Sequence, residues 1–377
     1  MDSNFQPTRA AGLARLAAFA PHAGRDYSAG RNTDLGPDAE RTTSTLSPYL
    51  RRRLVLEQEV VATAEAAHDS GAQKYVQEVF WRTYFKGHLE TRPFLWTDYL
   101  ARAAAGHAEL RANAGLRLAY EQATTGRTGI DCLDDWAREL TTENWLHNHT
   151  RMWFASIWIF TLRLPWALGA DFFMRHLLDG DPASNTLSWR WVAGLHTRGK
   201  HYVARAENIR RYTDGRYDPQ DLDEEPSSLD EPDLGGPIPM PRADKPPSGE
   251  VALLLHLDDL HPESLPLSDA RVTRVGGTIA NPDGAVDAVR QFNRAAMDDA
   301  LARAAAHFGC PAELAAPDWN AELPIVTAYA PVGLSASALP PSLRIRRDWD
   351  TETWPHATRG FFKVKNAIPG LLARHPG

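Results

Sequence analysis

This chain of 377 residues has few cysteines, no excess of basic charge and no long apolar run. The two cysteines, Cys132 and Cys310, are too few for a disulfide framework, a four-cysteine iron–sulfur site or a structural zinc site of their own. We therefore expect a reducing compartment, the cytoplasm, and no metal. No apolar run reaches membrane-spanning length, and the first residues do not resemble a signal peptide.

The formal net charge of −7 argues against a protein that binds nucleic acid over its whole surface. Any contact with DNA must then use a local basic patch. Two candidates are the run Arg51, Arg52 and Arg53 and the set Arg198, Lys200, Arg205, Arg210 and Arg211. The alternative for each is a solvated helix face.

The chain divides into three segments by its pattern of residues. Residues 1–217 show apolar side chains at helix spacing, and residues 218–249 are rich in proline and acidic residues, which predicts a disordered or extended linker. In residues 250–377, predicted strands alternate with helices, which favours a small, mostly parallel α/β sheet. We expect strands at 251–255, 271–279, 323–329 and 343–346, and helices at 285–308 and 361–372. The fold class is therefore mainly α, with a small Rossmann-like α/β domain.

No glycine-rich phosphate loop follows any predicted strand, so nucleotide binding is not expected in the α/β segment. What the chain does have is tryptophan. Residues 145–152 read WLHNHTRM, and residues 179–191 read DGDPASNTLSWRW. Large planar side chains supply π-faces for a flat ligand, and the Asn, Arg and Asp between them supply directional hydrogen bonds and charge.

These two stretches resemble the FAD-binding domain of the photolyase and cryptochrome family. TSTLSPYL at 43–50 and KYVQEVFWR at 74–82 resemble further family motifs, so that the resemblance covers about residues 7–212. It implies an all-helical domain that holds FAD. Ser47 and Pro48 independently indicate a helix start, with Ser47 as the cap.

The resemblance assigns the cofactor-binding residues. The hydroxyls near the helix start suit a diphosphate. Arg82 and Arg151 would supply positive charge, which an anionic reduced flavin needs, with Asp179 and Asp181 as counter-charges. Asn185 would lie at the N5 edge of the flavin. The full set is Tyr27, Thr43, Ser44, Thr45, Leu46, Ser47, Tyr75, Arg82, Asn148, Arg151, Asp179, Asp181 and Asn185.

Five residues match the pocket in which the family holds a cyclobutane pyrimidine dimer: Glu78, Trp81, Asn148, Met152 and Trp191. By resemblance, Trp81 and Trp191 would stack on the extruded bases, and Asn148 and Glu78 would hydrogen-bond to them. His149 stands where the family commonly has arginine, which predicts weaker or pH-dependent binding of duplex DNA.

Trp189 and Trp166 resemble the first two members of the family's electron-transfer chain. The third member is not evident, and Tyr120, Trp153 and Trp158 stay open as candidates. Glu78, Asn185, Trp189 and Trp166 are thus the predicted catalytic residues.

The implied function is photolyase-like. Reduced anionic FAD would use light to split pyrimidine dimers in DNA, and the protein would be a monomer that favours single-stranded or weakly bound DNA.

The usual antenna domain does not precede the flavin motifs, and residues 250–260 and 358–363 faintly resemble parts of that domain in permuted order. Three alternatives stay open: a cryptochrome-like light sensor with a protein partner, a flavin scaffold without photochemistry, and repair of the (6-4) lesion, for which His147 or His149 would face the flavin.

Overall fold

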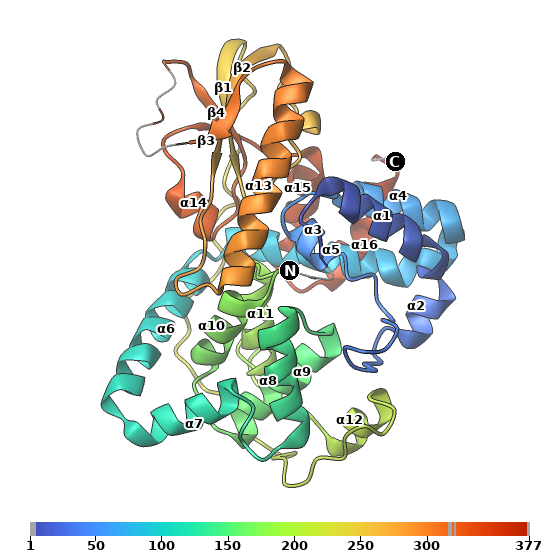
Figure 1. Cartoon of the computed structure of the whole chain (residues 1–377), viewed down its shortest axis with the longest axis vertical. Helices are drawn as coiled ribbons and strands as arrows, with labels where there is room; N and C mark the ends of the chain where they lie inside the picture. Colours follow the sequence, from blue (N-terminus) through green and yellow to red (C-terminus); the bar gives the residue numbers. More distant parts are fainter. Residues whose placement is uncertain (1–4, 316–318, 320–321, 375–377) are drawn as a thin grey trace.

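The computed structural model describes residues 5–315, 319 and 322–374. A helical part and a small α/β part lie against each other, with the sheet at one end of the longest axis (Figure 1). The predicted class, mainly α with a small α/β region, is confirmed. None of the described helices combines the length and the apolar character that crossing a membrane would need.

The helical part, as far as the chain is described, is built from twelve α-helices. They are α1 (Arg9–Phe19), α2 (Arg25–Gly30), α3 (Ser47–Arg51), α4 (Glu57–His68), α5 (Gln73–Glu90), α6 (Phe94–Ala112), α7 (Ala114–Thr124), α8 (Asp131–Glu143), α9 (Asn148–Ser156), α10 (Trp166–His176), α11 (Pro182–Val192) and α12 (Ala206–Tyr212). Short 3-10 turns at Ala20–His22 and Asp69–Ala72 and a π-helical turn at Ile157–Thr161 join some of them. The helix start at Ser47 is confirmed, but Ser47 is already the first helical residue and Leu46 takes the cap position.

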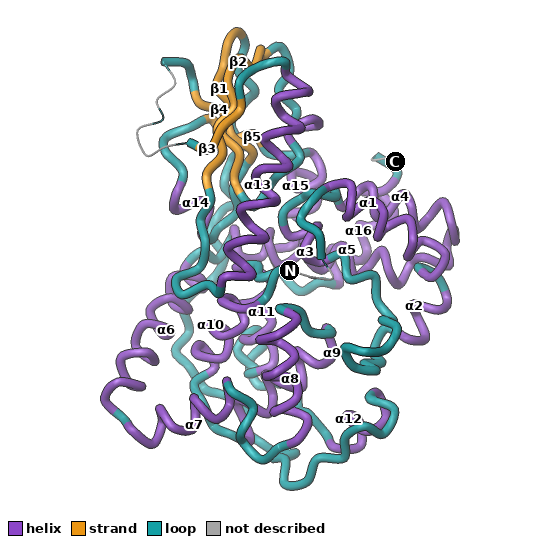
Figure 2. Tube along the Cα trace, in the orientation of Figure 1, coloured by secondary structure: helices purple, strands orange, loops and turns teal. Residues whose placement is uncertain are grey.

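The α/β part holds one fully parallel sheet (Figure 2). Its strands are β1 (Gly249–His256), β2 (Ala270–Thr278), β3 (Ala312–Leu314), β4 (Ile325–Ala328) and β5 (Leu343–Ile345), in the order β3-β2-β1-β4-β5. The helices are α13 (Asp287–Phe308), α14 (Leu334–Ala338), α15 (Asp348–Thr353) and α16 (Phe362–Leu372), with 3-10 turns at Pro262–Ser264 and Trp354–Thr358. The predicted strands and helices are all present; β3, α14 and α15 are additional. The relation to a permuted antenna domain stays a prediction.

The segment between the two parts is extended, without helix or strand from residue 217 to 248. It is nevertheless held against the helical part. The backbone N–H of Leu229 donates to the carbonyl of Ala193, and that of Ile238 to the carbonyl of Thr91. Trp166 Nε1 donates to the Glu231 carboxylate at 2.9 Å. Acidic side chains of the segment thus find indole and guanidinium partners rather than only solvent.

Two hydrophobic cores support the structure. One joins α1 to α5 with the sheet and with α13 and α16, and the other lies among α6 to α11. Because the first core contains both Leu50 and Val251, it crosses the predicted boundary between the helical and α/β segments. The division at 217 and 250 stays a prediction, and the packing across it is continuous.

The three arginines at positions 51 to 53, at the end of α3 and just after it, are buried, so the prediction that they form a DNA-binding patch is wrong. Arg51 Nη1 lies 2.5 Å from Asp258. Arg53 contacts Asp350 at 2.7 Å, Glu57 at 3.1 Å and Asp259 at 3.4 Å. A run of arginines at a helix end looks solvated in the sequence, but carboxylates from the α/β part meet it here. We call Arg51, Arg53 and their partners Glu57, Asp258, Asp259 and Asp350 the interface network.

Asp259 is a member of the interface network with two arginine partners from different parts of the chain. Arg347 contacts it through Nε at 2.6 Å and Nη2 at 2.8 Å, and Arg53 at 3.4 Å. Asp259→Asn would leave the buried Arg347 without its carboxylate partner and would remove one of the three carboxylates around Arg53. Breaking a buried ion pair in this way typically costs about 3–5 kcal/mol. Urea unfolding should show this loss.

The matched control is Asp287→Asn, because Asp287 pairs with Arg290 on the exposed surface of α13. Such pairs contribute about 0–1 kcal/mol. Equal losses in the two variants would contradict the interface network as a source of stability.

Candidate functional site

The predicted phosphate loop, residues 43–47, is hydrogen-bonded to two distant parts of the chain. Trp145 Nε1 donates to Ser47 Oγ at 3.2 Å, and Arg15 Nη1 donates to Thr45 Oγ1. Thr45 adopts a positive φ of 51°. The hydroxyl of Thr43 is buried and has no hydrogen-bond partner among the described residues. The loop therefore keeps a buried polar group that a ligand could satisfy.

Tyr27 and Tyr75 are packed edge to face, with ring centroids 4.9 Å apart, and both are buried. Burial raises the pKa of Tyr75, and a side-chain hydrogen bond with Ser44 opposes that shift. The structure thus brings α2, α5 and the phosphate loop together, as the resemblance implied for these residues.

Arg82 and Asp181, two of the charged residues assigned to the cofactor site, lie close together. Arg82 Nη2 is 3.6 Å from Asp181 and also donates to the carbonyl of Arg51 at 2.9 Å. Asp181 caps α11 by accepting from Ser184 N at 2.8 Å. Burial alone would raise the pKa of Asp181, but Arg82, Lys86 and Arg51 together hold it well below its ordinary value. Asp181 therefore stays ionised.

Lys86 is a member of this charge cluster that the sequence analysis missed. It lies one turn after Arg82 on α5, and its ammonium is 4.0 Å from Asp181. Burial lowers the pKa of Lys86 to about 8. The i, i+4 spacing from Arg82 was the available signal, because residues four apart share one helix face.

By resemblance Asp179 would pair with Arg151, and the two are in contact at 2.8 Å. Arg151 Nε also donates to the carbonyl of Leu146 at 3.0 Å. The other carboxylate oxygen of Asp179 is buried without a hydrogen-bond partner in the described part of the chain. Asn185, on α11, donates from Nδ2 to the carbonyl of Ala170 at 2.8 Å. Unsatisfied oxygens at Thr43 and Asp179, among paired cations, fit a large polar ligand such as FAD.

All five predicted lesion-pocket side chains remain accessible, whereas most of their helix neighbours are buried. Glu78 and Trp81 come from α5, Asn148 and Met152 from α9, and Trp191 from the end of α11. Helix α11 packs against both α5 and α9. Glu78 is 3.6 Å from Arg31 and 3.5 Å from Lys74. Three adjoining helices therefore present the five residues.

The segment that follows α11 contacts the helices that carry the lesion-pocket residues. Tyr84, three residues after Trp81, bonds to His196 at 3.1 Å. Tyr202 stacks on Trp191 with ring centroids 5.5 Å apart. The hydroxyl of Tyr202 in turn lies 3.2 Å from Nε2 of His149. The segment after α11 is thus tied both to α5 and to α9.

His149 cannot act as the predicted pH-dependent DNA contact. Its ring stacks on Trp153 at 4.1 Å, its Nδ1 lies 2.9 Å from the carbonyl of Asn32, and it is buried. Burial lowers the pKa of His149, so the ring is neutral at neutral pH. The prediction of a pH-dependent contact is wrong because both ring nitrogens are used inside the fold, whereas weaker binding of duplex DNA stays a prediction. Arg198, Lys200, Arg205, Arg210 and Arg211 are exposed, as predicted.

The aromatic contacts of the predicted electron-transfer residues form two runs. The ring centroids of Trp189 and Trp158 lie 6.3 Å apart, and those of Trp158 and Tyr120 lie 5.8 Å apart. Tyr120 is half-buried and accepts a hydrogen bond from Arg175 at 2.6 Å. Separately, Trp166 contacts Tyr99 at 6.1 Å. Of the three candidates for the end of the chain, Trp158 and Tyr120 lie on the run from Trp189.

The first turn of α9, which carries Asn148, is fixed by buried polar groups. Thr150 donates a hydrogen bond to Asp34. Glu139 on α8 is also buried, and burial together with Asp34 raises its pKa to about 8. The folded protein thus holds a proton on Glu139 that the unfolded chain, with a pKa near the ordinary value of 4.5, loses earlier.

This raised pKa makes the free energy of unfolding fall as the pH rises from about 4.5 to 8, by at most about 1.4 kcal/mol for each pH unit. Glu139→Gln removes the titrating group. Relative to wild type, we expect a higher Tm for this variant at pH 8.5 and little gain at pH 4.5. The exposed Glu121→Gln serves as the control, and an equal gain at both pH values would contradict the assignment.

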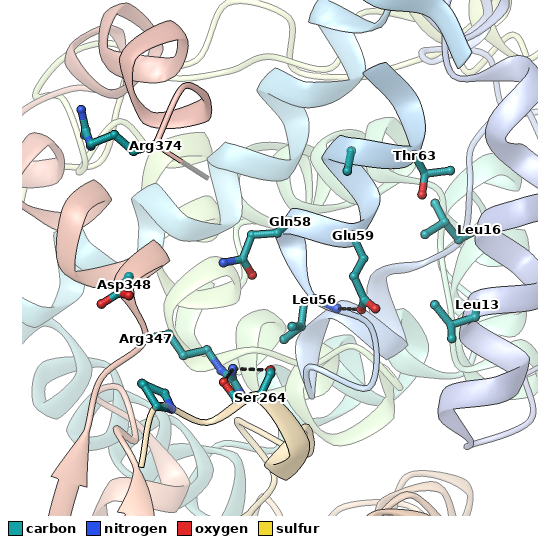
Figure 3. A pocket seen from close by; sticks show the side chains of 12 residues that line it. Leu13, Leu16, Leu56, Gln58, Glu59, Thr63, Ser264, Arg347, Asp348 and Arg374 are labelled. Carbon is teal, nitrogen blue, oxygen red and sulfur yellow. Dashed lines mark hydrogen bonds between the residues drawn. The ribbon is translucent and has the colours of Figure 1, made fainter. Parts of the chain in front are cut away.

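A cavity of about 680 Å³ lies elsewhere, between α1, α4 and the α/β part. Figure 3 shows Leu13 and Leu16 on one side and Arg347, hydrogen-bonded to Ser264, on the other. None of the predicted cofactor or lesion residues lines it. The cavity is therefore separate from the candidate site.

Comparisons with known proteins show what parts of this chain are similar to. Residues 75–222 match the family model for the FAD binding domain of DNA photolyase. The resemblance to the FAD-binding domain of the photolyase and cryptochrome family is thus supported by a family model over these residues. The matched segment contains α5, α9 and α11, whereas Tyr27 and the phosphate loop lie outside it.

Two curated relatives are deoxyribodipyrimidine photo-lyases. That of Streptomyces griseus is 34% identical over 220 residues, which are 55% of this chain and 45% of the relative. That of a Synechococcus strain is 33% identical over 196 residues, covering 50% and 39%. The chain thus spans less than half the length of these relatives. A crystal structure of a bacterial class III photolyase from Agrobacterium tumefaciens matches 54% of this chain and 42% of its own, at 24% identity and a TM-score of 0.45.

Proposed function

We propose that this protein binds FAD and uses light to split cyclobutane pyrimidine dimers in DNA. One observation carries the proposal. Glu78, Trp81, Asn148, Met152 and Trp191 are accessible on α5, α9 and α11, and the charged residues assigned to the cofactor, Arg82, Arg151 and Asp181, lie on or next to the same helices. A light sensor without a lesion substrate has no physical need for all five. The family match and the names of the relatives support the same chemistry.

The buried charged and hydroxyl residues of this chain would bind the cofactor. Arg82, Lys86 and Arg151 would offset negative charge on the cofactor, with Asp179 and Asp181 fixing their geometry, and the buried hydroxyl of Thr43 lies in the loop assigned to the diphosphate. When bound in its reduced anionic form, FAD would supply an electron to the dimer on absorbing blue or near-ultraviolet light. The protein contributes binding, orientation and electrostatics.

On the accessible side, Trp81 and Trp191 offer faces for bases taken out of the helix, which offsets part of the unstacking cost at about 1–3 kcal/mol per base. Glu78 and Asn148 offer hydrogen bonds to the edges of the bases. By resemblance, Asn185 is proposed to lie at the N5 edge of the cofactor, and the hydrogen bond from its Nδ2 to the carbonyl of Ala170 fixes its side chain.

The test is repair in solution. Protein loaded with reduced FAD is illuminated with a dimer-containing oligonucleotide, and the recovery of thymine absorbance is followed. Wild type should restore the absorbance. Glu78→Gln should lower the repair rate at subsaturating substrate roughly 10-fold or more, because hydrogen bonds to a charged group are worth about 1.5–3 kcal/mol.

Glu109→Gln, an exposed change on α6, is the control and should repair at the wild-type rate. No recovery by wild type despite bound, reduced FAD would rule out dimer repair.

We further propose single-stranded DNA as the preferred form. The net charge of −7, the burial of Arg51 to Arg53 and the neutral, buried His149 leave few cations for duplex backbone. The exposed basic residues from Arg198 to Arg211 remain for phosphate contacts. The same assay with a duplex substrate should give slower repair than with the single strand.

Trp189 is proposed as the residue that passes electrons to oxidised FAD during photoreduction, with Trp166 as a further member by resemblance. The ring contacts through Trp158 offer a path to the half-buried Tyr120. Trp189→Phe should strongly slow photoreduction with a thiol present, as followed by flavin absorbance. Trp153→Phe, a change at a buried tryptophan off this path, should leave it near the wild-type rate; equal slowing in both variants would contradict the role of Trp189.

A further inference from the structure

Trp81 is stacked on a ring from the far end of the chain. Its indole and the ring of Phe361 are nearly parallel, at 11°, with centroids 3.8 Å apart. Phe361 immediately precedes α16 and is 7% exposed. Helices α16 and α5 lie side by side (Figure 1). A residue of the α/β part thus covers one face of a predicted lesion-pocket tryptophan.

Helix α5 and the residues just after it fix the segment that leads to Phe361. The carbonyl of Ala357 accepts from His88 Nδ1 at 3.2 Å, and that of Thr358 accepts from Arg92 Nη2 at 3.0 Å. Trp354 lies so close to Gly87 that a Cβ there would come within 2.8 Å of the indole. The position of Phe361 is therefore set by contacts with the same helix that carries Trp81.

Two further rings also restrict the indole of Trp81. Tyr84 meets it edge-on at 5.5 Å, and Phe85 lies at 5.5 Å with a tilt of 38°. With one face stacked on Phe361, a base can stack only on the opposite face. Trp191 is supported in the same manner by Tyr202.

We propose that Phe361 is a positioning residue of the lesion pocket: it holds the plane of Trp81 so that one defined face meets the dimer. The inference rests on the proposed function and adds that the α/β part completes the substrate site. Pre-organisation of this kind lowers the entropy lost when the ligand binds. Removal of the Phe361 ring should therefore weaken dimer binding and leave the cofactor in place.

The experiment measures Kd in the dark for a dimer-containing oligonucleotide and for its undamaged counterpart, with the full FAD-loaded chain. Phe361→Ala should weaken the binding of the dimer roughly 2- to 12-fold, the range expected for one aromatic pair, with unchanged binding of undamaged DNA and unchanged flavin absorbance. Phe361→Tyr keeps the ring and should bind the dimer as wild type does. Phe362→Ala is the matched control, because the next side chain is 76% exposed.

Phe361→Leu covers the case in which the alanine variant does not fold. It keeps an apolar side chain but no planar ring, so it should lose preference for the dimer while retaining FAD and a Tm close to wild type. Wild-type preference in Phe361→Leu, or in folded Phe361→Ala, would overturn the positioning role alone. No preference for the dimer in wild type would remove the proposed function and this inference together.

Discussion

Buried charge governs how this chain is assembled. Arg51 and Arg53 are nearly inaccessible, and their carboxylate partners Asp258, Asp259 and Asp350 come from the α/β part. Because an unpaired buried ion is costly, the two parts can fold to full stability only in register with each other. Arg51 also bonds to the carbonyl of Gly180 and lies 3.7 Å from Asp181. The charges that join the parts are thus continuous with those of the candidate flavin site.

That continuity links the fold to the site. Asp181 caps α11 and lies in the fields of Arg51, Arg82 and Lys86, so the same carboxylate orients a helix and stays ionised among cations. Helix α11 then carries Asn185 on its buried side and ends in the accessible Trp191. A buried polar layer beneath an accessible aromatic layer is what a flat, charged cofactor facing a base-sized substrate requires.

Local patterns were enough to predict the helical character of residues 1–217 and the parallel sheet, and the resemblance implied the Arg151–Asp179 contact. Positions 51 to 53 and 149 were misjudged because local sequence does not reveal distant partners. Arg51 and Arg53 meet carboxylates, and Arg52 meets the side-chain oxygen of Asn293, all more than two hundred positions away. His149 meets the backbone of Asn32. The stack of Phe361 on Trp81 could not be predicted for the same reason, because the two residues are far apart in the sequence. Lys86 is different, since its spacing from Arg82 already placed both on one face of α5.

The most direct measurement of the central claim is the flavin content of the folded chain. The protein is mixed with FAD, freed of unbound ligand by gel filtration, and its absorbance in the blue is compared with its protein content. Stoichiometric FAD that co-elutes with the folded chain is the predicted result. A well-folded but colourless protein, still colourless after this treatment, would contradict the existence of the site among these helices.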